Sequence, residues 1–232
     1  MKNILVCEDE DTIRDFVVIN LKRAGYNVVD VDNGEDALKV FDEHNGNFDI
    51  ALLDIMMPGI DGFTVCKNLR SRSQGLGIIM LSAKSQEMDK VSGLMIGADD
   101  YVTKPFSPSE LVARVDAISR RVGVAVTNAP KLIESGPFVL NQKNRTLTKN
   151  GQYIELTQVE YQIMELFFKR EGMALSRQSI LDLIWGENYY SDIKIVDVNI
   201  RRLRMKIEDI PSNPQYIQTI WGFGYKWKTS NS

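Results

Sequence analysis

The sequence predicts an α/β fold with a doubly wound parallel sheet in its first half and a smaller α+β domain in its second half. Three observations support this prediction. Short apolar runs alternate with amphipathic segments through residues 1–121, and a different pattern of hairpins and helices follows from residue 133 to residue 232. Residues 122–132 lack periodicity and contain Asn-Ala-Pro, so we expect a linker there. The two halves also differ in charge, with 14 Lys+Arg against 20 Asp+Glu before residue 122 and 14 against 11 after it.

The first half contains five candidate strands, and their nearly continuous apolar character is typical of strands buried on both faces of a parallel sheet. These strands are expected at 3–8, 26–32, 49–54, 77–82 and 100–104. The amphipathic segments between them predict covering helices, and Gly25 suits the C-terminus of the first. Such an arrangement is flavodoxin-like, and ligands of that architecture bind at the carboxyl edge of the sheet.

Carboxylates stand at the ends of two of these strands. Glu8 and Asp9 end the first strand, and Asp54 ends the apolar run in ALLDIMMPGIDG. If these strands are adjacent and parallel, three like charges meet at one edge and need a cation to offset their repulsion. All-oxygen ligands favour a hard ion such as Mg²⁺, which binds a few carboxylates and a phosphate while keeping several waters.

The next two strands end in groups that suit a phosphoryl ligand. Ser82 offers a hydroxyl that can hydrogen-bond a phosphoryl oxygen, and Lys104 offers a mobile positive charge. With these groups around it, Asp54 is expected to attack a phosphoryl group in line and form an acyl phosphate. Local explanations also exist, since acids cap helices, Asp can begin a turn and Lys is common at surfaces. The Lys104-Pro105 bond is a candidate for a cis peptide.

The phrases VCEDE, LLDIMMPGIDG, IIMLSAK and ADDYVTKPFS closely resemble the receiver domain of bacterial two-component response regulators. The resemblance extends over residues 1–121. It implies that Asp54 accepts phosphate from a sensor histidine kinase and that Mg²⁺ is held by Glu8, Asp9, Asp54 and the backbone carbonyl of Met56. It also implies that Ser82 and Tyr101 form a switch pair, with Ser82 standing where the family often has Thr.

Charged residues of both signs occur through residues 87–121. They are also explained as a solvated surface with weak ion pairs. In the resembling subfamily, matching positions pair across a symmetric receiver dimer, and self-complementary charge is what a two-fold interface requires. The resemblance therefore implies a homodimer that forms on phosphorylation, with Lys90 facing Glu110, Asp100 facing Arg114 and Asp99 facing Arg121.

The second half begins with short antiparallel strands and continues with helices. Asn150-Gly151 is a strong hairpin signal. Three helical segments are expected at 157–172, 176–186 and 194–209, followed by β-rich pieces around Gly222 and Gly224. Helices followed by a glycine-cornered hairpin indicate a small winged-helix module.

The last of these helices has an apolar stripe and a basic remainder. Val196, Ile200, Leu203 and Ile207 share one face, which places Arg201 and Arg202 away from that stripe. A basic outward face fits the DNA major groove, although a solvated cationic face would have the same pattern.

The phrases LTQVEYQIMELFFKREG, VDVNIRRLRMKIE and YIQTIWGFGYKW resemble the winged-helix effector of the OmpR/PhoB class over about residues 133–228. The resemblance implies recognition of promoter DNA by the helix at 194–208, and contact with RNA polymerase through the loop 185–192. Many members carry Arg before the first wing glycine, where it can enter the minor groove, whereas this chain has Trp221. Trp cannot supply that charge, so the resemblance does not carry over any minor-groove contact of the wing at this position. The residues expected to bind DNA are Lys194, Val198, Asn199, Arg201, Arg202, Arg204 and Lys226.

Location and chemistry are constrained by what the sequence lacks. No apolar run approaches the roughly 20 residues of a membrane span, so we expect no membrane insertion and a cytoplasmic location. Cys7 and Cys66 are expected to be buried thiols.

Two other functions are considered. A phosphohydrolase with an aspartyl-phosphate intermediate usually needs an acid where Met56 stands, and a phosphorylation-independent DNA-binding protein would not need the complete pocket. We therefore expect a phosphorylated regulator and not a turnover enzyme.

Overall fold

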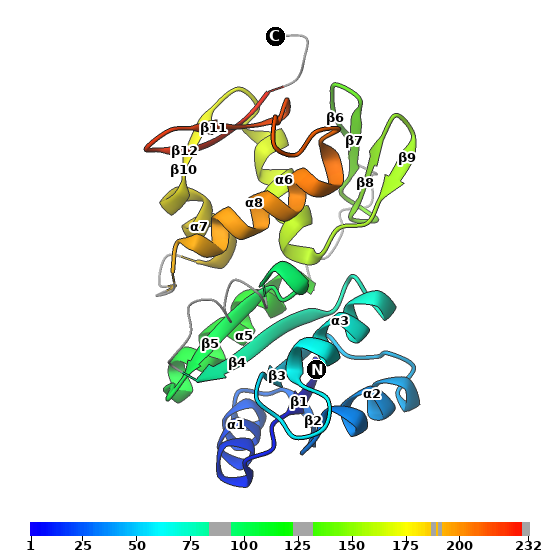
Figure 1. Cartoon of the computed structure of the whole chain (residues 1–232), viewed down its shortest axis with the longest axis vertical. Helices are drawn as coiled ribbons and strands as arrows, with labels where there is room; N and C mark the ends of the chain where they lie inside the picture. Colours follow the sequence, from blue (N-terminus) through cyan, green and yellow to red (C-terminus); the bar gives the residue numbers. More distant parts are fainter. Residues whose placement is uncertain (84–93, 123–131, 187–188, 190–191, 229–232) are drawn as a thin grey trace. The chain divides into compact units, whose positions relative to one another are not determined.

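The computed structural model describes residues 1–83, 94–122, 132–186, 189 and 192–228. The chain forms two compact units, Met1–Gly123 and Val124–Ser232 (Figure 1). Residues 123–131 lie outside the described ranges, so the expected linker and the domain limits on either side of it stay predictions.

The first unit contains the parallel sheet that the sequence predicts. Its strand order is β2-β1-β3-β4-β5, and every neighbouring pair is parallel. This is one of the two common orders of doubly wound sheets, and β1 and β3 are the neighbours at the point where the order reverses. The strands are β1 (Asn3–Cys7), β2 (Asn27–Val31), β3 (Ile50–Asp54), β4 (Gly77–Ala83) and β5 (Asp100–Lys104).

Helices cover both faces of this sheet. One core joins inward side chains of the sheet, such as Val6 and Leu52, to Leu21 of α1 and Leu111 of α5. Phe41 of α2 is buried on the other face, where α2 and α3 pack together. These helices are α1 (Asp11–Arg23), α2 (Gly34–Glu43), α3 (Gly62–Arg72) and α5 (Pro108–Val122). A further helix is expected from residue 87, but residues 84–93 lie outside the described ranges.

Side-chain caps fix the starts of α2 and α3. The Asn33 side chain accepts a hydrogen bond from the backbone N–H of Asp36 at the start of α2. Asp61 does the same for Thr64 at the start of α3. Such caps pair backbone donors that the first helical turn leaves free. The Asp61 cap therefore fixes the α3 end of the loop that follows Asp54.

In its described residues, the second unit combines two small antiparallel sheets with three helices. The first sheet is a meander in the order β6-β7-β8-β9, and its last turn has positive φ at Asn150 (51°) and Gly151 (78°), as the Asn-Gly signal predicts. The strands are β6 (Leu132–Ser135), β7 (Phe138–Asn141), β8 (Thr146–Lys149) and β9 (Gln152–Ile154). The helices are α6 (Gln158–Lys169), α7 (Arg177–Trp185) and α8 (Lys194–Ile207).

The second sheet of this unit contains the wing hairpin. Its order is β10-β12-β11, with β10 (Ala174–Ser176), β11 (Ile217–Ile220) and β12 (Gly224–Trp227). The winged-helix prediction is confirmed. The sequence did not indicate β10, because three residues are too few for an alternating pattern.

Candidate functional site

Three carboxylates meet at the carboxyl edge of the parallel sheet, as the strand order requires. One oxygen from each of Glu8, Asp9 and Asp54 lies within 4.8 Å of the others. Glu8 and Asp54 are buried, whereas Asp9 is exposed. They converge because β1 and β3 are parallel neighbours that end level with each other, with Cys7 opposite Leu53.

Lys104 bridges two of these carboxylates from the end of β5. Its Nζ lies 2.7 Å from Glu8 Oε1 and 3.0 Å from Asp54 Oδ2. Burial alone would lower the pKa of Lys104, but the hydrogen bond to Glu8 and the charge of Asp54 outweigh it and raise that pKa. Burial raises the pKa of Glu8 to about 7, with a smaller increase from Asp54 and partial compensation by Lys104.

The residues of this pocket fit a hard divalent cation. Glu8 Oε2 is buried and has no hydrogen-bond partner among the described residues. An orphaned carboxylate oxygen beside two further carboxylates is a donor set that Mg²⁺ accepts. Met56, expected to add its backbone carbonyl, follows Asp54 by two residues, and its side chain is exposed.

The remaining expected pocket residues lie on β4 and β5. The Ser82 hydroxyl is buried and donates to the backbone oxygen of Ala83 at 3.0 Å. Tyr101 lies on β5 opposite Met80 of β4. The Lys104-Pro105 peptide is cis, as the sequence suggested.

Cys7 contacts this pocket, but its thiol is not suited to act as a nucleophile. Its Sγ lies 3.3 Å from Met57 Sδ and 3.2 Å from the backbone oxygen of Asn33. Burial, followed by the charges of Asp54 and Glu8, raises the pKa of the thiol to about 12. A thiol with that pKa stays protonated near neutral pH and is a poor nucleophile. The prediction that Cys7 and Cys66 are buried free thiols is confirmed.

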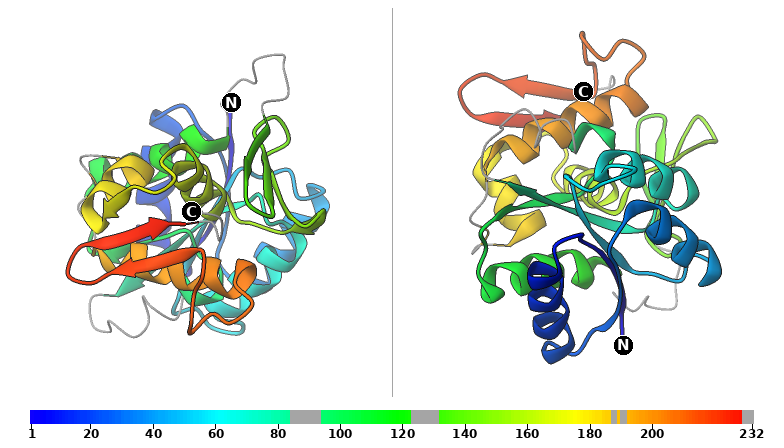
Figure 2. Two further views of the ribbon diagram at one scale, coloured as in Figure 1. Left: turned by 90° about the horizontal axis from the view of Figure 1, so that it is seen from above. Right: turned by 60° about the horizontal axis from the view of Figure 1, so that its bottom comes forward.

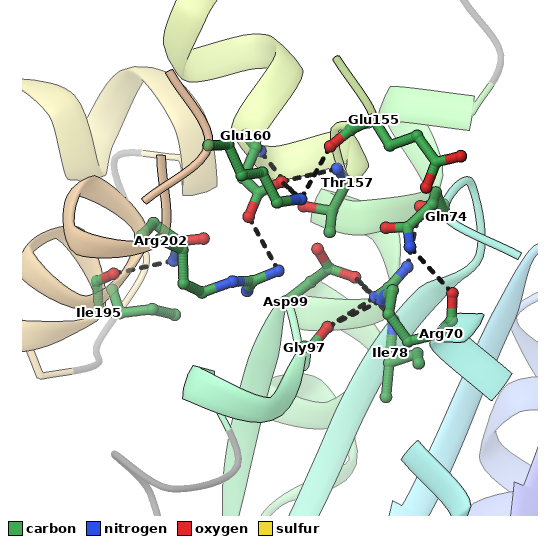
Figure 3. Close-up of polar contacts among 12 residues, drawn as sticks. Arg70, Gln74, Ile78, Gly97, Asp99, Glu155, Thr157, Glu160, Ile195 and Arg202 are labelled. Atoms are coloured by element: carbon green, nitrogen blue, oxygen red, sulfur yellow. Dashed lines mark hydrogen bonds and ion pairs between the residues drawn. The ribbon is translucent and has the colours of Figure 1, made fainter. Parts of the chain in front are cut away.

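The three acids expected at a dimer interface pair within their own unit. Asp99 Oδ2 lies 2.8 Å from Arg70 Nη2 and accepts the backbone N–H of Ile78 at 2.9 Å (Figure 3). Asp100 pairs with Arg114 at 3.3 Å, and Arg114 also pairs with Glu110 at 2.8 Å. Lys90 and the side chain of Arg121 lie outside the described part of the chain.

Arg70 is a partner that the sequence reasoning missed. Its guanidinium also donates to the backbone oxygens of Gly97 and Leu76, at 2.7 and 2.6 Å. Arg70 and Arg72 both stand in the last turn of α3, and no local pattern marks Arg70 as the buried one. Only the packed sheet shows that it joins α3 to the segment before β5.

The predicted apolar stripe of α8 is confirmed, because Val196, Ile200, Leu203 and Ile207 are all buried. Arg201 is exposed, as expected of a residue that reads DNA. The outward placement of Arg202 is wrong. Its Nη2 lies 3.0 Å from Oε1 of Glu160 on α6, toward which the guanidinium points (Figure 3).

Glu160 explains why Arg202 turns toward α6. This fully buried carboxylate also lies 2.7 Å from Lys206 Nζ and closes a capping box with Thr157, the N-cap of α6. Burial alone would raise the pKa of Glu160, but Arg202 and Lys206 outweigh it and lower that pKa. Helical projection of α8 alone could not show that an acid from another helix attracts its cations.

Arg204 ties α8 to the wing. Its guanidinium donates to the backbone oxygen of Ile217 at 2.6 Å and to Thr219 Oγ1 at 2.9 Å. It also lies over the Tyr225 ring, with Cζ 5.5 Å from the centroid. Burial lowers the pKa of Arg204, against smaller opposing effects of Tyr225 and Glu208. These contacts assign Arg204 a role in joining helix and wing.

The other residues expected to bind DNA are distributed around α8 and the wing. Asn199 donates its amide to the backbone oxygen of Ile195 in its own helix at 2.8 Å. Val198 is buried, Lys194 is exposed at the start of α8, and Lys226 is half-buried on β12. Of the loop expected to contact RNA polymerase, residues 187–188 and 190–191 lie outside the described ranges.

Comparison with known proteins gives two family matches. The response regulator receiver domain matches residues 4–116, and the C-terminal domain of transcriptional regulatory proteins matches residues 151–227. The sensory transduction protein RegX3 of Mycobacterium bovis is 40% identical over 227 residues, which cover 97% of this chain and 99% of that protein. RegX3 of Mycolicibacterium smegmatis is also 40% identical, over 229 residues, with coverage of 97% and 99%.

This chain is a response regulator of the OmpR/PhoB family. Solved structures agree with that assignment. A mutant of RitR aligns with a TM-score of 0.75 at 25% identity, covering 98% of this chain and 99% of that one. DrrB of Thermotoga maritima, described as an OmpR/PhoB homologue, aligns with a TM-score of 0.52 at 30% identity, covering 99% and 100%.

The family assignment gives each unit its general role. The first unit is a receiver domain, and the second is a DNA-binding domain of a transcription regulator. Among the described residues, no helix has the length and apolar character to cross a membrane.

Proposed function

We propose that a sensor histidine kinase phosphorylates Asp54 in a Mg²⁺-dependent reaction, and that the phosphorylated chain dimerises and binds promoter DNA to regulate transcription. One observation carries the receiver part of this proposal. Glu8, Asp9 and Asp54 present oxygens within 4.8 Å of one another, and Lys104 Nζ lies 3.0 Å from Asp54. A nucleophilic carboxylate, an acidic cation site and a mobile amine are the parts that phosphoryl transfer needs.

The chain's residues have distinct parts in this step. An oxygen of Asp54 attacks the phosphorus in line, and the bond from phosphorus to the imidazole nitrogen of the donor histidine breaks. Lys104 moves from the carboxylates to the phosphoryl oxygens, and the Ser82 hydroxyl donates to one of them. A Mg²⁺ held by Glu8, Asp9, Asp54 and the Met56 carbonyl would neutralise charge on the same oxygens. The product is an aspartyl phosphate that water hydrolyses slowly.

Dimerisation follows from the charged face of the receiver. Asp100, Arg114 and Glu110 already form an ion-pair cluster within one chain, at 3.3 and 2.8 Å. We propose that two copies exchange such pairs, together with Lys90 and Arg121. Asp99 contributes less, since Arg70 neutralises it within its own receiver.

The DNA-binding part of the proposal rests on α8. Arg201 is exposed and is expected to hydrogen-bond to base edges in the major groove. Lys194 and Lys226 are expected to contact phosphates of the DNA backbone. Arg202 and Arg204 instead hold α8 against α6 and the wing. The loop 185–192 is proposed to contact RNA polymerase, and the cytoplasm is the expected location.

The first experiment compares the wild-type chain and Asp54→Ala after treatment with acetyl phosphate and Mg²⁺. Intact mass counts phosphoryl groups, light scattering measures dimerisation, and random-site selection finds bound DNA. Asp42→Ala is the control, because Asp42 pairs at the surface with Arg72. One phosphoryl group and tighter DNA binding are expected for the wild type and the control. Equal binding by all three chains would contradict phosphorylation control.

The same treatment separates the other two functions. A phosphohydrolase would turn over many equivalents of a small phosphate ester, whereas this chain is expected to hold one phosphoryl group. A DNA-binding protein without phosphorylation control would select the same sites before and after treatment. The side chain of Met56, where such hydrolases usually have an acid, argues against turnover.

A further inference from the structure

The tip of the β11–β12 wing exposes two large aromatic side chains. Trp221 is 91% exposed and Phe223 is 48% exposed. The tip joins β11 to β12 at one end of the three-stranded sheet β10-β12-β11 (Figure 2). Tryptophan normally buries most of its surface, and the other two, Trp185 and Trp227, are buried in this domain. An exposed aromatic pair at the tip of a wing is therefore a candidate contact surface.

The wing is fixed to α8 at two points. Arg204 of α8 donates hydrogen bonds to the Ile217 backbone oxygen and the Thr219 hydroxyl of β11, as described above. On the other strand, the Tyr225 hydroxyl donates to Asp197 Oδ1 of α8 at 2.7 Å. Helix and wing therefore approach a DNA duplex together.

This coupling sets where Trp221 lies relative to the helix. Trp221 follows Thr219 by two residues, so it stands roughly 7 Å further along the hairpin than the Arg204 contact. Gly222 has φ +71° and nothing within 4 Å of a built Cβ, so the tip is open on that side. With α8 in a major groove, a tip at this reach meets the adjoining backbone and minor groove.

The chemistry around the tip is suited to DNA. Residues 215–232 contain no Asp or Glu, and Lys226 and Lys228 provide positive charge near phosphates. The minor groove accepts apolar wedges against sugars and base steps. At A·T pairs its floor carries only acceptors, which suit the indole N–H donor, whereas G·C pairs add the guanine amino donor.

We propose that Trp221, supported by Phe223, contacts the DNA minor groove beside the α8 site and gives the chain a salt-independent preference for A·T pairs there. The proposal rests on the DNA-binding function of this domain. This contact differs from that of a charged wing residue. A cationic side chain releases counterions from the DNA phosphates when it binds, whereas a neutral indole releases none. Its contribution to affinity should therefore be insensitive to salt.

The test measures binding of the full chain to its selected DNA site, with A·T or G·C pairs flanking that site. Trp221→Ala should bind the A·T-flanked site about tenfold more weakly, lose the flank preference and keep the wild-type salt dependence. Trp221→Phe should keep most of the affinity. Trp221→Arg should steepen the slope of log K against log salt by about 0.9. Tyr153→Ala is the control, because Tyr153 is a 61% exposed aromatic on β9.

Fluorescence gives an independent reading. Because Trp185 and Trp227 are buried, iodide should quench mainly Trp221, and DNA with A·T flanks should protect it. Equal affinity of Trp221→Ala and wild type, with no protection, would overturn the proposal while DNA binding itself stood. Loss of self-association in Trp221→Ala at unchanged affinity would overturn it in favour of a second copy as partner. No binding by the wild type would instead overturn the DNA-binding function on which the proposal rests.

Discussion

Gly62 faces the backbone of Asp54 at a distance that leaves no room for a side chain. A Cβ built on Gly62 would lie 2.0 Å from the Asp54 carbonyl oxygen and 2.8 Å from its carbon. The first turn of α3 therefore packs directly on the end of β3, where the expected phosphoacceptor stands. Glycine is required there because the backbones approach so closely.

Gly62→Ala should displace α3 or the end of β3 and destabilise the receiver by about 1–3 kcal/mol, as overpacking usually does. Acetyl phosphate should also modify Asp54 more slowly, because the carboxylate moves with its backbone. Thermal unfolding and the rate of phosphorylation measure the two effects. Gly75→Ala is the control, since nothing lies within 4 Å of its built Cβ. Wild-type behaviour of Gly62→Ala would contradict the geometry.

Lys104→Gln should change metal binding and phosphorylation in opposite directions. Lys104 neutralises Glu8 and Asp54, so its removal leaves a more negative pocket, and Mg²⁺ should bind about tenfold more tightly. Phosphorylation should slow by about 100-fold, because no amine remains to balance the phosphoryl oxygens. Calorimetry with Mg²⁺ alone and intact mass with acetyl phosphate report each effect. Lys39→Gln, at an exposed position on α2, should change neither. Weaker Mg²⁺ binding by Lys104→Gln would show that the lysine does not compete for the acids.

Glu160→Gln should destabilise the DNA-binding domain by about 3–5 kcal/mol, the usual cost of breaking a buried ion pair. The substitution leaves Arg202 and Lys206 without the carboxylate that lies 3.0 and 2.7 Å from them. Denaturant unfolding measures the change. Glu165→Gln on the same helix is the control, since its pair with the exposed Lys169 should contribute less than about 1 kcal/mol. Equal effects of the two substitutions would argue against a special role of Glu160.

The stability difference between the wild type and Glu160→Gln should depend on pH. The folded-state pKa of Glu160 lies below its ordinary value of 4.5. A depressed carboxyl pKa stabilises the fold above 4.5, and that contribution is lost as pH falls through the folded pKa. The two chains should therefore converge in stability in acid. Unfolding midpoints measured between neutral and acidic pH test this, and a constant difference would contradict it.

Arg70→Ala should destabilise the receiver far more than Arg72→Ala, although the two arginines stand two residues apart on α3. Removing Arg70 leaves the buried Asp99 without its cation, at a cost of about 3–5 kcal/mol. Arg72 pairs with the exposed Asp42, and its loss should cost less than about 1 kcal/mol. Thermal unfolding of the two variants provides the measurement. Similar midpoints would mean that Asp99 finds another partner, such as the proposed dimer contact.

The receiver pocket was predictable from the sequence to an unusual degree. Parallel strands that alternate with helices deliver their carboxyl ends to one edge, so Glu8, Asp54 and Lys104 could be placed together from order alone. The 2.7 and 3.0 Å contacts of Lys104 agree with that expectation. The Asn150-Gly151 turn was equally clear, because that dipeptide accepts positive φ at both positions.

The basic helix was only partly predictable. Its apolar stripe follows from the 3.6-residue period, and the buried stripe on α8 confirms it. The roles of Arg202 and Arg204 do not follow from any period, since one pairs with Glu160 of α6 and the other holds Ile217 of β11. Projection of a single helix assigns faces but not the partners that other elements bring.

The sequence by itself determined the two-domain plan, the parallel sheet and the acids at its edge, because hydrophobic period and strand ends are local properties. Only the tertiary structure decided which charged side chains stay exposed to solvent and which form buried ion pairs. Arg70 and Asp99 lie 29 residues apart and Glu160 and Lys206 lie 46 apart. Such pairs form because a buried charge needs a partner, and packing alone determines which charge is buried beside which.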